Sequence, residues 1–255
     1  MANILIIPDV HARSFWKQAI EEKLNEVDNV IFNGDYVDPY PEEGFTRKDA
    51  IAALEEVIKL KQENPEKVIL LLGNHDMQYV NRRFDTRSRF DSSNAYKIME
   101  TFKSHRSLFK LAHEETIANK RFLFTHAGLM MTWYERFKDL IGDLTVDNLN
   151  HLTETPGGVD ALADYSSYRG MFGSTTGSIV WSDIREKFAN EEDANADGFD
   201  FQIFGHTQLH ENPIVTNTWA CLDCRRAFIL DENGNLKELD GSDIRKAEIP
   251  TDKMG

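Results

Sequence analysis

The chain has 255 residues, of which 41% are hydrophobic, and a formal net charge of −14 at pH 7. This length and composition can build a substantial core, so a largely disordered protein is excluded. The acidic balance also argues against a general binder of nucleic acid polymers, because such proteins neutralise phosphates with clustered lysine and arginine. A small phosphorylated ligand stays compatible with it, since a local group of cations can oppose the overall charge.

The N-terminal segment "MANILIIPDVH" has a short apolar run that stops at Pro8 and Asp9, with no basic leader. This pattern predicts a strand rather than a signal peptide. No stretch of the sequence approaches the roughly 20 apolar residues that a membrane-spanning helix needs. We therefore expect a cytoplasmic protein without a membrane partner.

Five short apolar runs recur along the chain, each without strict alternation of apolar and polar residues. Such runs, rich in β-branched and aromatic side chains, are typical of strands buried on both faces of a sheet. The five runs are "NILII" (3–7), "NVIFN" (29–33), "KVILLL" (67–72), "RFLFT" (121–125) and "FQIFG" (201–205).

Helical patterns lie between these runs. The clearest is "TRKDAIAALEEVIKLKQENP", in which Ile51, Leu54 and Ile58 form an apolar stripe with a period of about 3.6 residues. Thr46 can cap its start and Pro65 lies just past its end. A second helix is predicted in "SSNAYKIMETFKSHRSLFKLA", beginning near residues 92–93. Strands that alternate with helices predict an α/β architecture.

The pattern changes toward the C-terminal end, over about residues 214–240. "NTWACLD" and "RRAFIL" resemble strands, and "DENGNLKEL" contains Asn233-Gly234, a strong hairpin signal. This region therefore predicts antiparallel strands and a mixed sheet. Because no repeat or linker interrupts the sequence, we expect a single domain over residues 1–255.

The two cysteines, Cys221 and Cys224, stand close together in "ACLDC". A zinc site usually needs four ligands, and a redox pair usually opens a helix after a strand. This pair lies in a strand-like run and the other half of a zinc motif is missing. We interpret the pair as structural.

Each of the five apolar runs ends in polar residues that suit a metal ion. In open α/β sheets ligands bind beyond the carboxyl ends of strands, so these tips can converge on one site. Six ligands are too many for one tetrahedral ion, but two ions that share a bridging carboxylate would use them all. The absence of thiolate suits manganese, iron or zinc. The six candidates, in chain order, are Asp9, His11, Asp35, Asn74, His126 and His206.

The motifs "DVH", "GDYVD", "GNHD", "THAG" and "GHT" stand over residues 9–207 in the order and spacing of a known superfamily. The sequence resembles the calcineurin-like metallophosphoesterases, and most of all the branch with phosphoprotein phosphatases and symmetrical bis(5'-nucleosyl)-tetraphosphatases. "GDYVD" and "VWSD" (180–183) resemble motifs of that branch. The resemblance implies a four-layer αββα sandwich, in which two mixed sheets pack face to face between helices.

The resemblance also assigns the six ligands to two divalent or mixed-valence ions. It implies that Asp9 and His11 bind the first ion, that Asp35 bridges the two, and that the second is bound by Asn74, His126 and His206. Gln208 stands where many members of the superfamily have a further histidine ligand, which agrees with the phosphoprotein phosphatase branch.

The chemistry expected of two such ions is direct attack on phosphorus by a hydroxide held between them. The leaving oxygen then needs a proton. His75 suits this task, because Asn74 before it can bind a metal while the imidazole faces the substrate. Asp38 is the candidate carboxylate that orients His75, and the resemblance implies the same pairing.

Phosphate oxygens also need cationic partners. Phosphoprotein phosphatases usually continue the second motif with Arg-Gly, whereas this chain has Pro39-Tyr40, which argues against protein phosphatase activity. Replacement donors could come from "NRRFDTRSRF", with Arg82, Arg83, Arg87 and Arg89, or from Arg169 in "YRGMFG". The predicted substrate-binding residues are Arg83, Arg87 and Arg169.

The function expected from these residues is hydrolysis of a phosphate ester or phosphoanhydride in a small molecule, either a phosphomonoester or a nucleoside polyphosphate. A protein Ser/Thr phosphatase is the alternative. A catalytically inactive binding module is a third interpretation, but it would leave an intact set of ligands and an intact acid unexplained.

Overall fold

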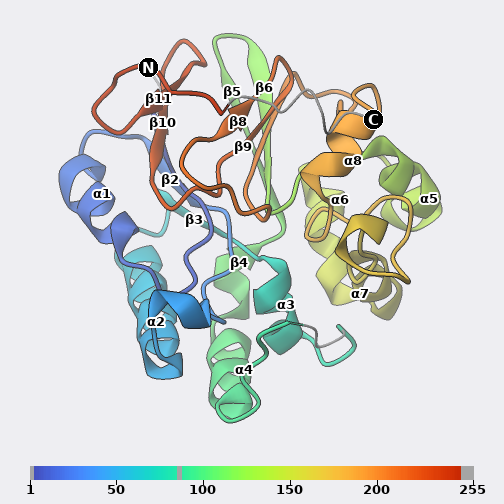
Figure 1. Ribbon diagram of the computed structural model, residues 1–255, viewed down its shortest axis with the longest axis horizontal. Coiled ribbons are helices and arrows are strands. Elements are labelled where there is room, and N and C mark those ends of the chain that lie inside the picture. Colours follow the sequence, from blue (N-terminus) through green and yellow to red (C-terminus); the bar gives the residue numbers. More distant parts are fainter. Residues whose placement is uncertain (1–2, 85–87, 248–255) are drawn as a thin grey trace. The chain divides into compact units, whose positions relative to one another are not determined.

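The computed structural model describes residues 3–84 and 88–247, and Figure 1 labels most of its helices and strands. The chain divides into two compact units, the first formed by residues 1–110 and 225–243 and the second by residues 111–224 and 244–255. Each unit contains one mixed sheet with helices against it. The predicted α/β class with two mixed sheets flanked by helices is confirmed.

The first unit has a six-stranded sheet in the order β11-β10-β1-β2-β3-β4. Strands β1 to β4 are parallel, and β10 and β11 extend the sheet antiparallel from β1. Its elements are β1 (Ile4–Ile7), α1 (Phe15–Lys23), β2 (Asn29–Phe32), the 3₁₀-helix η1 (Pro41–Glu43), α2 (Arg47–Glu63), β3 (Val68–Leu71), α3 (Asn74–Val80), α4 (Ala95–Ser104), the 3₁₀-helix η2 (Arg106–Leu108), β4 (Phe109–Lys110), β10 (Phe228–Leu230) and β11 (Leu236–Glu238).

The second unit has a five-stranded sheet in the order β5-β6-β7-β9-β8. The central strands β6, β7 and β9 are parallel, and β5 and β8 pair antiparallel at the two edges. Its elements are β5 (Ala112–Ile117), β6 (Lys120–Thr125), α5 (Met131–Ile141), α6 (Val146–His151), η3 (Leu152–Glu154), α7 (Pro156–Leu162), η4 (Ser167–Arg169), α8 (Ile184–Ala189), β7 (Phe201–Phe204), β8 (Ile214–Val215) and β9 (Trp219–Cys221).

All five apolar runs form strands, namely β1, β2, β3, β6 and β7. Every residue of β1 and β3 is buried, as expected of parallel strands covered on both faces. Helix α1 packs on β2 through Trp16 and Phe32, whose ring centroids are 5.6 Å apart. Helix α8 packs on β9 through Phe188 and Trp219, at 5.3 Å. Burying an aromatic or aliphatic side chain stabilises the fold by about 1.5–3 kcal/mol, so these contacts hold the helices to the sheets.

Helix α2 begins where the sequence predicts it. The Thr46 hydroxyl accepts a hydrogen bond from the Asp49 backbone N–H at 3.3 Å, and the Asp49 carboxylate accepts one from the Thr46 backbone N–H at 2.7 Å. Such a reciprocal cap satisfies two backbone donors that have no partner within the helix. Helix α4 begins later than predicted, at Ala95, because the Asp91 carboxylate accepts from the backbone N–H of Asn94 at 3.2 Å and keeps the preceding residues in a turn.

The predicted hairpin after β10 is confirmed, since β10 pairs antiparallel with β11 across the Asn233-Gly234 turn. Gly234 adopts φ +77°, the left-handed conformation that the hairpin signal requires. The buried thiol of Cys221 lies 3.3 Å from the Gly205 carbonyl oxygen and 3.5 Å from that of Thr207. Cys221 therefore supports the loop after β7, which agrees with a structural interpretation. Within residues 3–84 and 88–247, every helix is too short or too polar to cross a bilayer.

A buried lysine makes the second unit sensitive to pH. Lys187 on α8 is fully buried and donates a hydrogen bond to the Leu129 carbonyl oxygen at 3.0 Å. Burial lowers the pKa of its ammonium group from 10.5 to about 8. Below pH 8 both the folded and the unfolded chain carry the proton, so the cost of burying the charge is fully present. Between pH 8 and 10.5 only the unfolded chain binds it, and stability rises with pH.

Replacing Lys187 with methionine should therefore stabilise the protein at pH 7. The removed cost of burial is about 3 kcal/mol, offset by about 1 kcal/mol for the lost hydrogen bond. Urea unfolding at pH 7 and at pH 9.5 would measure the difference, with Lys120→Met on an exposed side chain as the control. The gain should shrink at pH 9.5, and a Lys187→Met protein less stable than the parent at pH 7 would refute this reading.

Candidate active site

Three of the predicted ligand positions follow parallel neighbours in the first sheet. Asp9 comes two residues after β1, Asp35 three residues after β2, and Asn74 opens α3 beyond β3. Parallel strands bring their carboxyl ends to one edge, which is where an α/β sheet binds ligands. All three side chains are buried, with 1%, 2% and 1% of their surface exposed, respectively.

The loops after β1 and β2 are tied together by their backbones. The His11 N–H donates to the Asp35 carbonyl oxygen at 2.7 Å. Both residues have positive φ, 42° for His11 and 52° for Asp35, and Asp38 does too at 56°. Non-glycine residues rarely adopt this conformation, and such strain concentrates at functional sites. The unfavourable backbone conformation of His11, Asp35 and Asp38 sets the directions in which their side chains point.

His11 is prepared as a neutral ligand. One ring nitrogen, Nδ1, lies 2.8 Å from the Val37 carbonyl oxygen, so it carries the proton and donates it. The other, Nε2, lies 3.3 Å from Oδ2 of Asp35. Burial lowers the pKa of this imidazole, although the hydrogen bond and charge of Asp35 act in the opposite direction. A neutral ring fixed by a carbonyl at Nδ1 leaves Nε2 as the donor atom for a metal.

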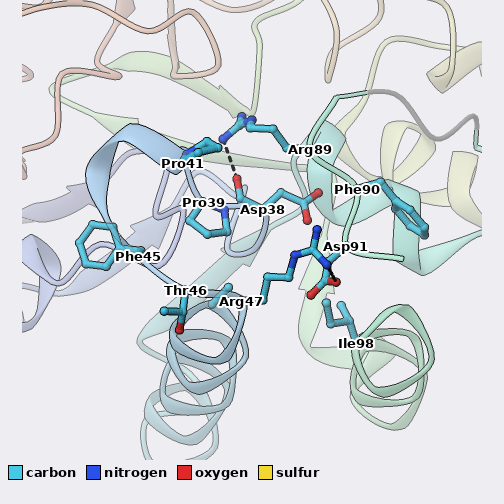
Figure 2. Close-up of a pocket in the computed structure, with 11 residues that line it drawn as sticks. Asp38, Pro39, Pro41, Phe45, Thr46, Arg47, Arg89, Phe90, Asp91 and Ile98 are labelled. Atoms are coloured by element: carbon cyan, nitrogen blue, oxygen red, sulfur yellow. Dashed lines mark hydrogen bonds and ion pairs between the residues drawn. The ribbon is translucent and has the colours of Figure 1, made fainter. Parts of the chain in front are cut away.

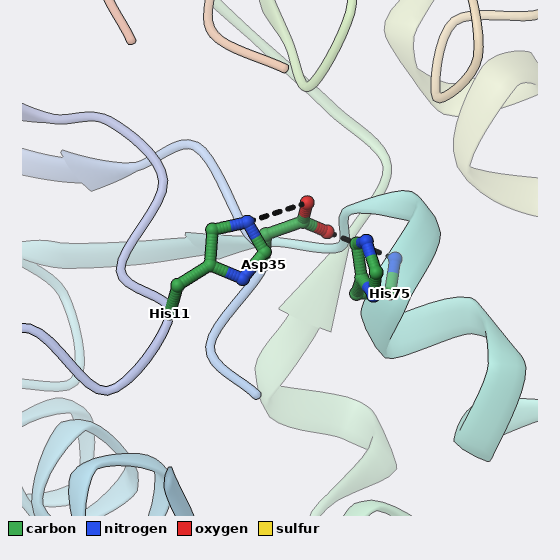
Figure 3. Close-up of side chains that lie close together, drawn as sticks. All are labelled: His11, Asp35 and His75. Carbon is green, nitrogen blue, oxygen red and sulfur yellow. Dashed lines mark hydrogen bonds and ion pairs between the residues drawn. The ribbon is translucent and has the colours of Figure 1, made fainter. Parts of the chain in front are cut away.

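Figure 3 shows the Asp35 carboxylate between His11 and His75. Its second oxygen, Oδ1, accepts the backbone N–H of His75 at 2.9 Å. His11, Asp35 and His75 offer ligand atoms within 4.8 Å of one another, and all three are buried. Both ring nitrogens of His75, however, already have other hydrogen-bond partners.

The His75 imidazole lies between the Asp38 carboxylate and the Arg89 guanidinium. Its Nδ1 is 2.9 Å from Oδ2 of Asp38, and its Nε2 accepts a hydrogen bond from the Arg89 guanidinium at 2.9 Å. Both contacts select the tautomer with the proton on Nδ1. The predicted pairing of His75 with Asp38 is therefore present in the structure, with Nε2 directed toward Arg89.

Asp38 is held by more than the histidine. The Tyr79 hydroxyl donates to its Oδ1 at 2.5 Å and accepts the Asp91 backbone N–H at 2.7 Å. Burial and the charge of Asp38 raise the pKa of this hydroxyl well above its usual range, so it stays a donor. The Gln78 amide donates to Oδ2 of the same carboxylate at 3.3 Å.

Asp76 accepts hydrogen bonds from three backbone N–H groups. Its Oδ2 accepts the N–H groups of Gly73 at 2.8 Å and Asp35 at 2.7 Å, and its Oδ1 accepts that of Tyr36 at 2.9 Å. The carboxylate thus binds the loop after β2 to the start of α3. The approach is close enough to require glycine, because a Cβ on Gly73 would lie 2.0 Å from Oδ1 of Asp35.

Arg89 lies beside the His75–Asp38 pair. Its guanidinium donates to the Asp38 carbonyl oxygen at 2.6 Å and lies 3.6 Å from the centre of the Tyr40 ring. A planar guanidinium suits both stacking on an aromatic ring and binding a phosphate. Of the predicted arginines, Arg83 is exposed and Arg87 lies outside the described residues. The sequence placed Arg89 in the right segment but gave no signal to select it.

The other two predicted ligands lie side by side in the second unit. His126 directly follows β6 and His206 follows β7, its parallel neighbour. Nε2 of His126 and Nδ1 of His206 are 3.1 Å apart, and the side chains are 0% and 7% exposed. Two imidazoles that bind one ion at about 2.0–2.1 Å each have nitrogens about 3 Å apart, so the pair fits a shared metal.

Arg169 also lies beside this histidine pair, through the residue that follows His206. It donates to the Thr207 hydroxyl at 2.7 Å, and its Nε is 2.7 Å from Oδ2 of Asp183. Burial would raise the pKa of Asp183, but the hydrogen bond from Arg185 and the charge of Arg169 outweigh it and lower that pKa. The carboxylate of the "VWSD" motif thus holds the guanidinium in place.

The family model for calcineurin-like phosphoesterases matches residues 2–209. The chain belongs to the calcineurin-like phosphoesterase family. It is therefore a hydrolase that acts on phosphate esters, in a family that uses divalent metals, and the predicted relationship is confirmed. The matched residues include all five motifs and parts of both units.

Two solved structures share the fold. A cold-active protein-tyrosine phosphatase of a psychrophilic Shewanella species matches with a TM-score of 0.59 and 15% identity, over 95% of this chain and 79% of its own. A protein serine/threonine phosphatase of Saccharomyces cerevisiae matches with a TM-score of 0.51 and 13% identity, over 98% and 82%. No curated protein matches the sequence. At these identities the structural matches support the fold of this phosphoesterase and not its substrate.

Proposed function

We propose that this phosphoesterase uses two divalent metal ions to hydrolyse a phosphate ester or phosphoanhydride of a small molecule, with water attacking phosphorus directly. The observation that carries the proposal is the burial of all six predicted ligands at strand ends, none more than 7% exposed. Buried polar groups are costly unless they have partners. Two carboxylates, an amide and three imidazoles, each on a segment that follows a strand, are the donor set that such ions prefer.

We propose for each ion the ligands that the family resemblance implies. Asp9 and His11 would bind the first ion, Asp35 would bridge, and Asn74, His126 and His206 would bind the second. When bound, two such ions supply an activated water and neutralise charge on the phosphoryl oxygens. Manganese, iron and zinc all suit this donor set.

His75 is the proposed general acid, with Asp38 as the residue that positions it. The structure has Nε2 of His75 occupied by the Arg89 guanidinium, at 2.9 Å. A substrate phosphate would draw that guanidinium away, because it offers charged oxygens in place of a neutral nitrogen. Nε2 can then take up a proton from solvent and give it to the leaving oxygen, while Nδ1 keeps its own proton and Asp38 stabilises the positively charged ring.

Arg89 is the proposed phosphate-binding residue in the first unit, in place of the arginine missing at Pro39. Arg89→Met should lower kcat/KM by about 10² to 10³ through loss of a charge-assisted pair. Steady-state kinetics would measure it against Arg82→Met, an exposed arginine of the same segment. Arg89→Lys should recover only part of the activity, since an ammonium lacks the planar fork. Equal effects of Arg89→Met and Arg82→Met would exclude this role.

Protein Ser/Thr phosphatase activity is the second candidate function. Pro39-Tyr40 argues against it, because phosphoprotein phosphatases usually have Arg-Gly at this place. Arg83, Arg87 and Arg169 remain proposed phosphate-binding residues for either function. We also propose that residues 1–255 function as one domain, in the cytoplasm and on a small substrate.

A substrate screen with added manganese tests the proposed function. The panel contains p-nitrophenyl phosphate, mononucleotides, dinucleoside polyphosphates, cyclic nucleotides and phosphopeptides. We expect turnover of small phosphorylated molecules that disappears with a chelator and returns with metal. Turnover of phosphopeptides far above that of every small molecule would favour the protein phosphatase alternative, and no turnover at all would refute both.

A further inference from the structure

A pocket of about 470 Å³ opens beside the proposed acid, wholly within the first unit. It lies between the first turn of α2 and the segment that leads from Arg89 into α4 (Figure 2). We call it the α2–α4 pocket. Its lining combines five polar or charged residues with six apolar ones, and the apolar residues are Pro39, Pro41, Phe45, Ala50, Phe90 and Ile98.

The α2–α4 pocket is continuous with the catalytic dyad through two shared residues. Asp38, which positions His75, and Arg89, which donates to Nε2 of His75, both line it. Nε2 is the atom that would protonate the leaving oxygen in the proposed function. A group attached to that oxygen can therefore extend into the pocket from its Arg89 end.

The far end of the pocket is polar on one edge. Arg47 is 2.9 Å from the Asp91 carboxylate and donates to the Ser93 hydroxyl at 2.9 Å, with 53% of its side chain exposed. Figure 2 shows this pair beside the first turn of α2, away from Arg89. The Asp91 carboxylate pairs with Arg47 and also accepts the backbone N–H of Asn94, just before α4. The Arg47–Asp91 pair therefore forms a fixed polar edge next to the apolar side chains.

We infer that the α2–α4 pocket binds the leaving group of the substrate, and that this group carries a planar ring. A pocket of 300–1,000 Å³ that combines apolar side chains with fixed polar groups suits a small molecule that carries both a ring and polar atoms. A ringless polyol such as glycerol would leave the apolar side chains of the lining in contact with water. The inference rests on the proposed function, because it takes His75 to be the acid. A nucleoside and a simple aryl group share the ring, and only the nucleoside also has a polar edge for Arg47.

Three phosphate monoesters with primary alkoxide leaving groups test the pocket: benzyl phosphate, adenosine 5'-monophosphate and glycerol 3-phosphate. Their leaving oxygens are similar in basicity, so differences in kcat/KM report on binding of the leaving group. We expect about a 10- to 100-fold preference for the two ring-bearing substrates, the usual value of burying a small apolar group in a matched pocket.

Two variants change the walls of the pocket. Ala50→Leu adds volume on α2, and Phe45→Ala removes a partly exposed wall without risk to the buried core. Each should raise KM for the ring-bearing substrates by about 10-fold and leave glycerol 3-phosphate unchanged, with Lys48→Ala on the exposed side of α2 as the control. Arg47→Met should weaken adenosine 5'-monophosphate alone if the ring is a nucleobase, and neither substrate if it is an aryl group.

The outcomes separate this inference from the proposed function. Equal kcat/KM for all three esters, unchanged by Ala50→Leu and Phe45→Ala, would overturn the leaving-group pocket while the enzyme remained a phosphoesterase. No hydrolysis of any ester by the metal-loaded parent protein would overturn both.

Discussion

Replacing His75 with alanine should lower kcat by about 10² to 10⁴ while the metal content stays that of the parent protein. The reason is the placement of the ring: Nδ1 is bound to Asp38 and Nε2 faces Arg89, so neither nitrogen is committed to a metal. Steady-state kinetics and metal analysis of the same preparation would measure both quantities. His151→Ala, on a side chain that is 67% exposed, is the matched control.

The leaving group gives this prediction a second readout. p-Nitrophenolate departs without a proton, whereas the alkoxide of benzyl phosphate needs one. His75→Ala should therefore reduce turnover of benzyl phosphate far more than turnover of p-nitrophenyl phosphate. Asp38→Asn should show the same selectivity with a smaller loss. Loss of metal from His75→Ala, or equal losses on both substrates, would make His75 a structural or metal-binding residue instead.

Replacing Asp35 with asparagine should remove most bound metal and lower kcat by at least about 10³, because a neutral amide is a poor bridge between two cations. The substitution preserves the shape of the side chain. Asparagine also tolerates the positive φ of 52° found at this position, so the backbone should hold. Metal analysis after dialysis would measure the loss directly.

The control for this variant is Asp139→Asn, an exposed carboxylate on α5. Circular dichroism should show that both variants fold. A folded Asp35→Asn protein with the metal content and turnover of the parent would exclude Asp35 as a bridge, and with it the assignment of the ligands that flank it in sequence.

Much of the fold could be predicted because burial leaves a clear pattern. The five apolar runs became strands, since a parallel strand covered on both faces needs apolar residues throughout. The edge strand β5 was missed because "AHEETI" has one exposed face, and its alternation of buried and exposed residues is short and interrupted by charge. Helices α5 to α8 were not assigned, and three of them, α6, α7 and α8, are only six or seven residues long.

The residues of the candidate site could be predicted where a metal-binding side chain comes soon after a strand. His126 is next to the end of β6, and His206 and Asn74 lie two and three residues past the ends of β7 and β3, so position in sequence nearly fixes position in space. Arg89 and Tyr79 could not be selected in this way. They reach Asp38 by side-chain contacts across about 40 to 50 residues of sequence, and nothing in their local pattern reports such a partner.

Asp76 shows how a fold uses a residue that looks catalytic. Its place in "GNHD" suggests another ligand, and the six-ligand count leaves it without that role. The structure gives it three backbone N–H groups, from Gly73, Asp35 and Tyr36, and so a part in holding the proposed bridging carboxylate. Backbone support of this kind orients ligands as much as direct contacts do.

The central claim is that this phosphoesterase works with two metal ions held by six buried residues. Titration of the metal-free protein with Mn²⁺, followed by binding and by turnover of p-nitrophenyl phosphate together, tests it most directly. The predicted result is two ions per chain, with full activity only when the second has bound. Full turnover in the metal-free protein, or saturation at a single ion, would contradict it.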